Sequence, residues 1–179
     1  NLPMSVAREL VDIASKINAV AIIDVPRNIN AREAVDWHNG TGKYIANGKI
    51  DSCYGAAFWN WLTIADPFTQ VLKDVPPTVG VLRCMSFTYD KAKPWYPISG
   101  ENRGIIPEAS RVQYQKVSHE AKSAMYGDGN SINPILLQFG QIMLYGERTL
   151  QRTESKLTAL HNVILVNEVR SEEHTSELQ

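Results

Sequence analysis

The central hydrophobic pattern of the chain lies in residues 132–150, INPILLQFGQIMLYGERTL. Two apolar runs, residues 135–139 and 141–145, flank a single Gly140, and neither run contains a charge. Short apolar runs bounded by turn residues are typical of buried strands. The stretch therefore predicts either two strands joined at Gly140 or one strand with a bulge there. Residues 147–149 are polar and are expected to carry the chain to the surface.

Four other stretches have the composition of strands. The first ends at Asp24, and a carboxylate at the carboxyl end of a central strand is either a ligand-site candidate or, more simply, a turn former before Pro26. The second is rich in aromatic and small residues, and its Trp59 and Trp61 would share one face. These four stretches are residues 19–23, 52–65, 112–117 and 161–168.

Helices are predicted between these strands by periodicity and by capping residues. Residues 5–17 carry apolar side chains with 4-3-4 spacing, at Val6, Leu10, Ile13 and Ile17. Asn30 and Glu33 have the spacing of a capping box, and Asn39-Gly40 stops the helix that they begin. Pro77 opens a helix whose apolar side is predicted to be Val79, Leu82, Met85 and Phe87. Ser118 caps a short helix over residues 119–126.

Residues 91–104, KAKPWYPISGENRG, contain two prolines and two glycines and have no periodicity, which predicts a long loop. We expect packing of Trp95 to order it, with Glu101, Asn102 and Arg103 turned outward as contacts. Residues 39–43 are predicted to be a surface loop, because HNGTGKY fails the phosphate-loop pattern at both of its ends. The predicted fold class is α/β, a mixed sheet with flanking helices.

The ten C-terminal residues, RSEEHTSELQ, agree codon by codon with an in-frame translation of a common sequencing adapter. We therefore expect residues 1–170 to form one α/β core domain, truncated at both ends, and residues 171–179 to be a non-native tail that stays exposed. The chain begins with Asn1, so an open reading frame from a short environmental read fits both ends.

The charge balance does not favour nucleic acid or membrane as a partner. The formal net charge is −1, and without the three glutamates of the tail 18 basic residues face 16 acidic ones, a net charge of +2. The longest apolar run is far too short to span a bilayer. Two isolated cysteines indicate buried thiols in a reducing compartment rather than a disulfide framework.

Enzymatic motifs are absent from the sequence. No histidine pair has metal-ligand spacing, and neither a Gly-x-Ser-x-Gly elbow nor a dinucleotide fingerprint occurs. A small cytosolic α/β enzyme that uses Cys53 or Cys84 as its nucleophile stays open as an alternative, although an apolar setting raises a thiol pKa. We predict no catalytic residue, no cofactor and no metal.

Taken in order, the landmarks resemble the C-terminal half of contractile bacteriophage tail sheath proteins. They are Asp24-Val25-Pro26, the aromatic stretch before Asp66-Pro67, Val75-Pro76-Pro77, the loop ending Gly-Glu-Asn-Arg-Gly, Asn133-Pro134-Ile135 and Gly146-Glu147-Arg148-Thr149-Leu150. The resemblance covers nearly all of residues 5–169. Members of this family more often have a small residue at the position of Glu147.

The resemblance implies a structural subunit that polymerises as stacked hexameric rings around a tail tube and contracts to drive the tube through the host envelope. The implied partners are other copies of the chain, the tail tube protein, and baseplate and tail terminator proteins. The implied location is the tail of a virion assembled in the bacterial cytoplasm. Related injection particles, pyocin-like or of type VI secretion, are the alternative. Subunit-contact candidates are Trp95, Glu101, Asn102, Arg103, Glu147 and Arg148.

We expect the chain produced alone to be poorly soluble or to form irregular oligomers. The predicted strand over residues 161–168 is apolar on alternate positions, including Val163 and Leu165, and would lack its neighbour. Size-exclusion chromatography with light scattering measures this, and a native C-terminal segment in place of residues 171–179 should improve solubility. A stable, monodisperse monomer would contradict the expectation.

Overall fold

The computed structural model describes residues 3–127 and 129–176. The strands are β1 Ala21–Asp24, β2 Gly55–Trp59, β3 Leu62–Ala65, β4 Leu72–Val75, β5 Ala109–Val112, β6 Ile132–Gln138 and β7 Gln141–Leu144. The helices are α1 Met4–Lys16, α2 Ala31–Asn39, α3 Pro77–Lys91, α4 His119–Tyr126 and α5 Leu160–Ser176, with short 3₁₀ turns at Gly42–Asn47 and Lys156–Thr158. The predicted class, a mixed sheet with flanking helices, is confirmed.

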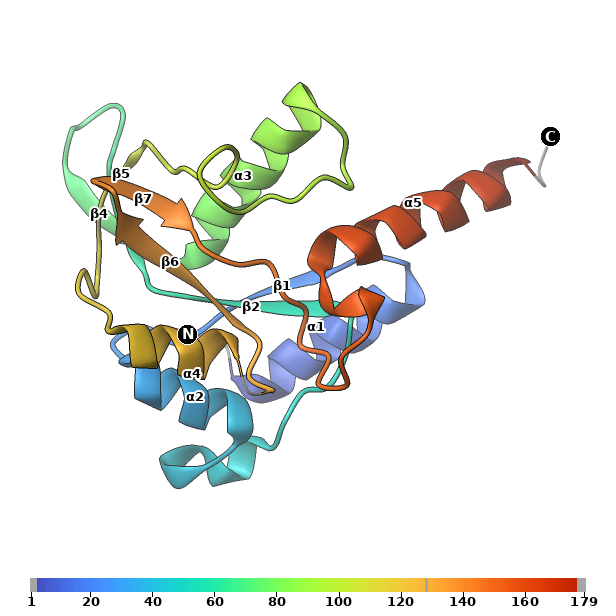
Figure 1. The fold of residues 1–179 in the computed structure, drawn as a ribbon, viewed down its shortest axis with the longest axis horizontal. Coiled ribbons are helices and arrows are strands. Elements are labelled where there is room, and N and C mark those ends of the chain that lie inside the picture. The colour runs from blue at the N-terminus through green and yellow to red at the C-terminus, as the bar shows by residue number, and fades with distance from the viewer. Residues whose placement is uncertain (1–2, 128, 177–179) are drawn as a thin grey trace.

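Two sheets organise the chain. The larger has the order β1-β2-β6-β7, in which β1, β2 and β6 are parallel and the β6–β7 hairpin is antiparallel. The smaller is antiparallel, in the order β4-β3-β5. It lies at the end of the molecule opposite the projecting part of α5 (Figure 1). Gly140 is therefore a turn between two strands, which decides between the two alternatives left by the sequence.

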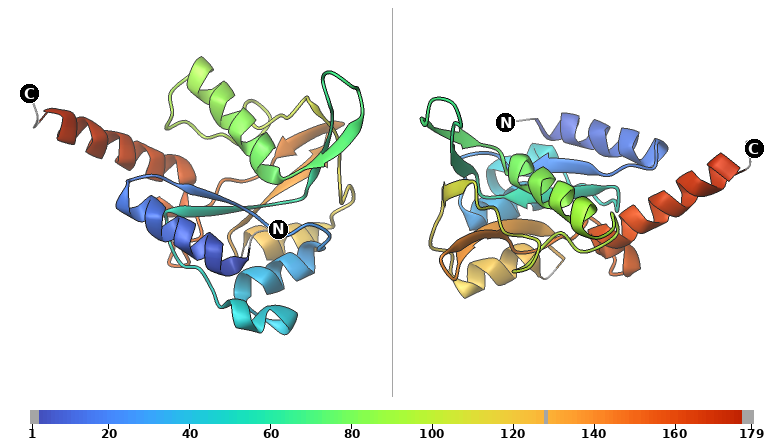
Figure 2. Two further views of the ribbon diagram at one scale, coloured as in Figure 1. Left: turned by 180° about the vertical axis from the view of Figure 1, so that it is seen from behind. Right: turned by 90° about the horizontal axis from the view of Figure 1, so that it is seen from above.

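Side chains alternate across the larger sheet and feed two separate cores. In β2, Ala57 and Trp59 enter a core with α1, α2 and α4, whereas Ala56 and Phe58 enter a core with α3 and the first turns of α5. This alternation is the period of two expected of a strand buried on both faces. Helices thus cover both faces of the sheet, as the rotated views show (Figure 2).

Asn60 connects the two sheets. Residues 52–65 were predicted to be one strand, but the chain turns at Asn60, where φ is 86°, and continues as β3 of the other sheet. The side chain is 1% exposed. Its Nδ2 donates to the carbonyls of Tyr114 (2.9 Å) and Ile135 (3.0 Å), and its Oδ1 accepts from the N–H of Tyr114 (2.9 Å). Asparagine fits because it tolerates positive φ and satisfies three main-chain groups.

The predicted capping residues are confirmed. Asn30 accepts from the Glu33 N–H while the Glu33 carboxylate accepts from the Asn30 N–H, each at 3.0 Å. Ser118 accepts from the N–H of Ala121 in α4. At the start of α3, Asp24 Oδ1 accepts from both the N–H and the hydroxyl of Thr78, at 2.7 Å each. Burial raises the pKa of the Asp24 carboxyl, and these bonds act against that rise.

The predicted apolar face of α1 is wrong, and that of α3 is wrong at Val79 and Leu82, whereas Met85 does pack against the core. In α1 the buried residues are Met4, Ala7, Val11 and Ala14, whereas Leu10, Ile13 and Ile17 are exposed by 39%, 47% and 66%. In α3 the buried face includes Gly80, Val81 and Cys84, and Val79 and Leu82 are exposed. The helices approach closely: a Cβ on Gly55 would lie 2.7 Å from Val11, and one on Gly80 would lie 2.6 Å from Ile106. Glycine at these two positions, one in β2 and one in α3, permits that approach.

The predicted last strand, residues 161–168, is also wrong, because this segment lies within helix α5. Its buried residues, Leu160, Val163, Ile164 and Asn167, have helical spacing. The incompletely covered strand assumed above therefore does not exist. The helix runs on through residues 171–176 and extends away from the body (Figure 2), with Ser171, Glu172 and Glu173 exposed. Residues 177–179 lie outside the described part.

Three smaller predictions need correction. The strand near residues 112–117 is β5 instead, at Ala109–Val112. Part of the predicted surface loop, residues 39–43, belongs to α2 and to the 3₁₀ turn at Gly42–Asn47. Residues 147–149 do not lead to the surface, because Glu147 and Thr149 are buried.

Asn60→Ala should lower the free energy of unfolding by about 3 kcal/mol, because it leaves buried main-chain groups of Tyr114 and Ile135 unpaired and strains an alanine at positive φ. Asn60→Gly removes the bonds without the strain and should cost about 2 kcal/mol. The exposed Asn102→Ala is the control, expected within about 0.5 kcal/mol of the parent. Urea denaturation measures all three. Equal stability of Asn60→Ala and the control would contradict the role of Asn60.

Candidate functional site: an assembly surface

The loop between α3 and β5 is held against the larger sheet by main-chain bonds. The Ile98 side chain is 1% exposed, and its N–H donates to Glu147 Oε2 at 2.8 Å. The Gly100 N–H donates to the Leu144 carbonyl at 2.9 Å, and the Leu144 N–H donates to the Gly104 carbonyl at 2.8 Å. The loop is therefore ordered mainly through Ile98 and β7, and Trp95 is only half-buried.

Gly104 makes this attachment possible. A Cβ at this position would lie 2.7 Å from the Gly100 nitrogen and 2.8 Å from the Leu144 carbonyl oxygen, closer than real contacts. An isolated bridge between Ile105 and Met143 continues the pairing along β7. The loop thereby covers the outer edge of β7. The Gly-Glu-Asn-Arg-Gly segment therefore contributes to the fold of the domain itself.

The opposite edge of the same sheet is different. Strand β1 pairs with β2 alone among the described strands. The N–H groups of Ala21 and Val25 point to β2. Because alternate residues of a strand face opposite sides, the main-chain groups of Ile22 and Asp24 face away from β2. The sheet thus has one edge covered by its own chain and one edge without a strand partner.

The six predicted contact residues occupy different environments. Glu101 and Asn102 are exposed, and Trp95 and Arg148 are half-buried. Arg103 is also half-buried: its Nε donates to the Pro97 carbonyl at 2.6 Å and its guanidinium lies 5.4 Å from the Tyr96 ring. The expectation that Arg103 turns outward is therefore wrong, because the side chain closes its own loop.

Glu147 connects the loop to α5 inside the domain. It is 7% exposed and accepts from the Ile98 N–H, and its Oε1 pairs with His161 Nδ1. The neighbouring Arg148 places its guanidinium 4.6 Å from the Tyr126 ring. Both side chains are engaged within this domain, so the exposed tip of the loop, Glu101 and Asn102, is the part of the candidate set that faces solvent.

Large apolar side chains are exposed at places where the sequence predicted burial or an ordinary turn. Besides the outer faces of α1 and α3, two turn residues stand out: Phe68 is 94% exposed between β3 and β4, and Phe139 is 84% exposed between β6 and β7. Single exposed apolar residues are ordinary, but a stripe along a helix marks a contact surface. We infer that Leu10, Ile13 and Ile17 form such a stripe.

The two thiols are poorly suited to nucleophilic catalysis. Burial raises the pKa of Cys84 to about 11, and it also raises the pKa of Cys53. Cys84 Sγ lies 4.0 Å from the carbonyl oxygen of Ile105. Within residues 3–127 and 129–176, no group of three or more His, Cys, Asp and Glu side chains could hold a metal ion, and no helix is long and apolar enough to cross a membrane.

Sequence reasoning missed two residues that position this surface. Asn60 lies between two tryptophans in an apolar stretch, and a lone asparagine there was the available signal for a turn with positive φ. Ile98 anchors the loop, whereas the prediction named Trp95, the largest side chain of the loop, as its anchor. Burial of a single aliphatic residue within a proline-rich loop leaves no periodic signal.

Solved structures with the same arrangement come from contractile particles. The chain aligns over 88% of its length with a chain of the PVC sheath complex of an extracellular contractile injection system in its contracted state, with a TM-score of 0.66 and 18% identity. It also aligns with a baseplate chain and with the contracted helical sheath of the anti-feeding prophage, with TM-scores of 0.58 and 0.53, each at 12% identity. The chain has the fold of a contractile-sheath domain.

The match covers 40% of the PVC chain, 48% of the anti-feeding prophage baseplate chain and 48% of its sheath chain. This sheath fold therefore spans less than half of each of those proteins. It covers 93% and 92% of the present chain in the two prophage comparisons. No family model and no curated protein matches the chain.

Cys84 should react with iodoacetamide at pH 8 about two orders of magnitude more slowly than an ordinary cysteine, because a thiol with a pKa near 11 is almost entirely protonated there. Mass spectrometry of tryptic peptides after timed quenching measures the rate at each cysteine. The same chain in urea is the control, in which both thiols should react at ordinary rates. Rapid modification of folded Cys84 would revive the enzyme alternative.

Proposed function

We propose that the chain is a domain of a sheath subunit that assembles with copies of itself around a tube in a contractile particle. The observation that carries the proposal is the alignment of 88% of the chain with a sheath chain of a contracted injection system at a TM-score of 0.66. At 18% identity this likeness concerns the fold alone, so the role rests on the additional features of the surface described above.

The unequal edges of the larger sheet support assembly. An edge strand without a partner is a template for pairing with another chain. Covering β7 with residues 100–106 leaves β1 as the edge where a strand from a neighbour can add. The resemblance found in the sequence implies terminal arms that add strands in this way. The apolar stripe on α1 adds surface that a neighbour would remove from water.

The proposed mechanism follows from interfaces rather than from bond chemistry. Subunits form hexameric rings, the rings stack around the tail tube protein, and contraction replaces one set of subunit contacts by a larger set. Each Å² of apolar surface newly buried contributes roughly 25 cal/mol. Baseplate and tail terminator proteins would bound the stack. The mechanism needs no cofactor, and the alternative of a cysteine enzyme loses support because burial raises the pKa of both candidate thiols.

Phage tails and injection particles are two settings for the same mechanism. The structural likeness with TM-scores above 0.5 is to an extracellular contractile injection system and to the anti-feeding prophage. This favours an injection particle as a second candidate beside the virion tail that the sequence resemblance implies. The gene that follows in the source DNA tests the sheath role common to both settings, because a tail tube gene there supports either setting and an enzyme operon supports neither.

The full-length gene product, produced in bacteria, should form hollow cylinders with regular cross-striation in negative-stain electron microscopy. Glu101→Lys combined with Asn102→Asp changes only the exposed tip of the loop and should reduce the number of cylinders if this tip makes a subunit contact. Lys93→Gln, on the same loop, is the matched control. A product that remains a soluble monomer at every concentration would contradict the sheath proposal.

A further inference from the structure

A small pocket lies between α4 and the segment that follows β7, apart from the strand edge and the apolar stripe considered so far. It has a volume of about 330 Å³, and we call it the Arg148 pocket. Two of its side chains carry a permanent positive charge, three have a hydroxyl group, and no carboxylate of the described residues lines it. The pocket is therefore a hollow surrounded by hydrogen-bond donors. The side chains that line it are His119, Lys122, Ser123, Tyr126, Tyr145 and Arg148.

The main chain of Arg148 is fixed by a buried asparagine. The Arg148 N–H donates to Asn133 Oδ1 at 2.6 Å, and the Arg148 carbonyl accepts from Asn133 Nδ2 at 2.7 Å. Asn133 is 0% exposed, and its Nδ2 also donates to the Ala57 carbonyl in β2 at 3.0 Å. An isolated bridge pairs Arg148 with Ala159 as well. These bonds attach the backbone of Arg148 to the centre of the larger sheet.

The end of the Arg148 side chain is positioned by an aromatic ring. The guanidinium lies 4.6 Å from the centre of the Tyr126 ring, which makes an edge contact with the Tyr145 ring at 6.0 Å between centroids. Tyr126 is itself placed against the main chain of Gly146, where a Cβ would collide with the ring. A ring contact orients a guanidinium without neutralising its charge. Two landmarks of the sequence, which contain Asn133 and Gly146, therefore act together to orient one cation.

The positive charge of the Arg148 pocket is not balanced by its surroundings. Neither Lys122 nor Arg148 forms an ion pair with any residue that the structure describes. Of the described carboxylates nearest to them in sequence, Glu120 lines a separate groove between α2 and α4, and Glu147 is buried and paired with His161. Two cations and no carboxylate give the lining a charge of +2. Such a site favours an added anion.

We propose that the Arg148 pocket binds a phosphate group as its dianion, either free phosphate or the end of a small phosphate monoester. A dianion matches the charge of +2, whereas a single carboxylate would leave one cation uncompensated. The phosphate oxygens can accept from the Arg148 fork, the Lys122 ammonium and the hydroxyls of Ser123, Tyr126 and Tyr145. The volume is at the lower end of the range for small-molecule sites, so any attached organic group is small. This inference does not rest on the proposed function.

Equilibrium dialysis with ³²P-labelled orthophosphate measures this binding, and it does not require the chain to be monomeric. The chain is dialysed at about pH 8, where a phosphate group is mainly dianionic. We expect saturable binding below about 5 mM phosphate. The binding should weaken roughly tenfold between about 20 mM and 500 mM sodium chloride, because salt screens the attraction between the cations and the anion.

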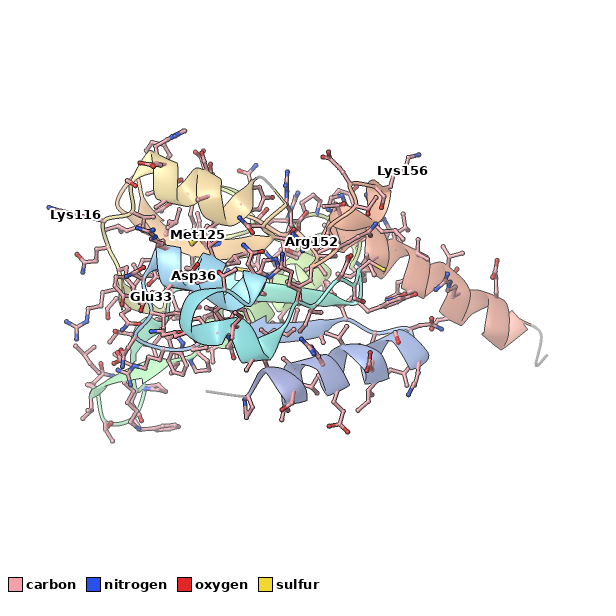
Figure 3. The ribbon with its side chains drawn as sticks, turned by 90° about the horizontal axis from the view of Figure 1, so that it is seen from below. Glu33, Asp36, Lys116, Met125, Arg152 and Lys156 are labelled. Atoms are coloured by element: carbon pink, nitrogen blue, oxygen red, sulfur yellow. The ribbon has the colours of Figure 1, made fainter. Side chains whose placement is uncertain are left out.

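Substitutions at two of the lining cations locate the bound phosphate. Arg148→Lys keeps the charge but loses the planar fork that binds two oxygens, and it should weaken phosphate binding about tenfold. Lys122→Gln removes one charge and should weaken the binding by a similar factor. Lys116→Gln is the matched control, because Lys116 is exposed and its side chain extends away from the body of the molecule (Figure 3). This control should bind phosphate as the unaltered chain does. Circular dichroism verifies that each variant is folded.

Competition at constant ionic strength identifies the form of the phosphate. Displacement of the label by phenyl phosphate about tenfold more effectively than by unlabelled phosphate indicates a monoester site, in which the organic group contacts Tyr145. Equal displacement by the two indicates a site for free phosphate. Acetate should compete at least about tenfold less well than either, because one carboxylate carries half the charge.

Three results would overturn the inference. They are the absence of saturable phosphate binding to the unaltered chain, undiminished binding by both the Arg148→Lys and the Lys122→Gln chains, and displacement of the label by acetate as effectively as by phosphate. The sheath proposal fails by a different observation, the absence of cylinders from the full-length product. The two proposals are therefore tested separately.

Discussion

The structure depends on the way that one buried asparagine redirects the chain between two sheets. Asn60 ends β2 at positive φ and bonds to Tyr114 and Ile135, so that the segment after β5 and strand β6 are fixed relative to each other. The side chain is 1% exposed and its bond to the Ile135 carbonyl is buried, which makes an unpaired group there costly. The smaller sheet takes its position from this junction.

A second constraint explains why so much apolar surface remains outside. Helix α1 packs on β2 at Gly55, and α3 packs against Ile106 at Gly80, at distances that leave no room for a Cβ on either glycine. The opposite faces of the two helices, which carry large apolar side chains, are exposed to water. This exposure is unfavourable for a monomer. A subunit of a polymer recovers that cost when a neighbour covers the surface. The open edge of β1 and the stripe on α1 therefore both agree with the proposed assembly.

The sequence was informative where the signal was local and misleading where close packing decided. The capping box at Asn30, the hairpin around Gly140 and the proline start of α3 depend on neighbouring residues and were predicted well. The faces of α1 and α3 were predicted from the spacing of large apolar side chains, but the buried faces also contain small residues, Ala7 and Ala14 in α1 and Gly80 in α3. Residues 161–168 have a strand-like composition, yet their burial follows helical spacing from Leu160 to Asn167. For the site, the exposure of Glu101 and Asn102 was foreseen, whereas burial of Glu147 depends on His161 and Ile98, which are distant in sequence.

The central claim is that this fold builds a helical wall through contacts between different faces of identical subunits. Cryo-electron microscopy of the polymer formed by the full-length protein tests it most directly. The account predicts a hollow helical tube whose repeating unit contains the fold of residues 3–168, with the β1 edge and the apolar stripe on α1 both lying at subunit boundaries. A tube in which both face solvent, or a full-length product that forms no ordered polymer, would contradict it.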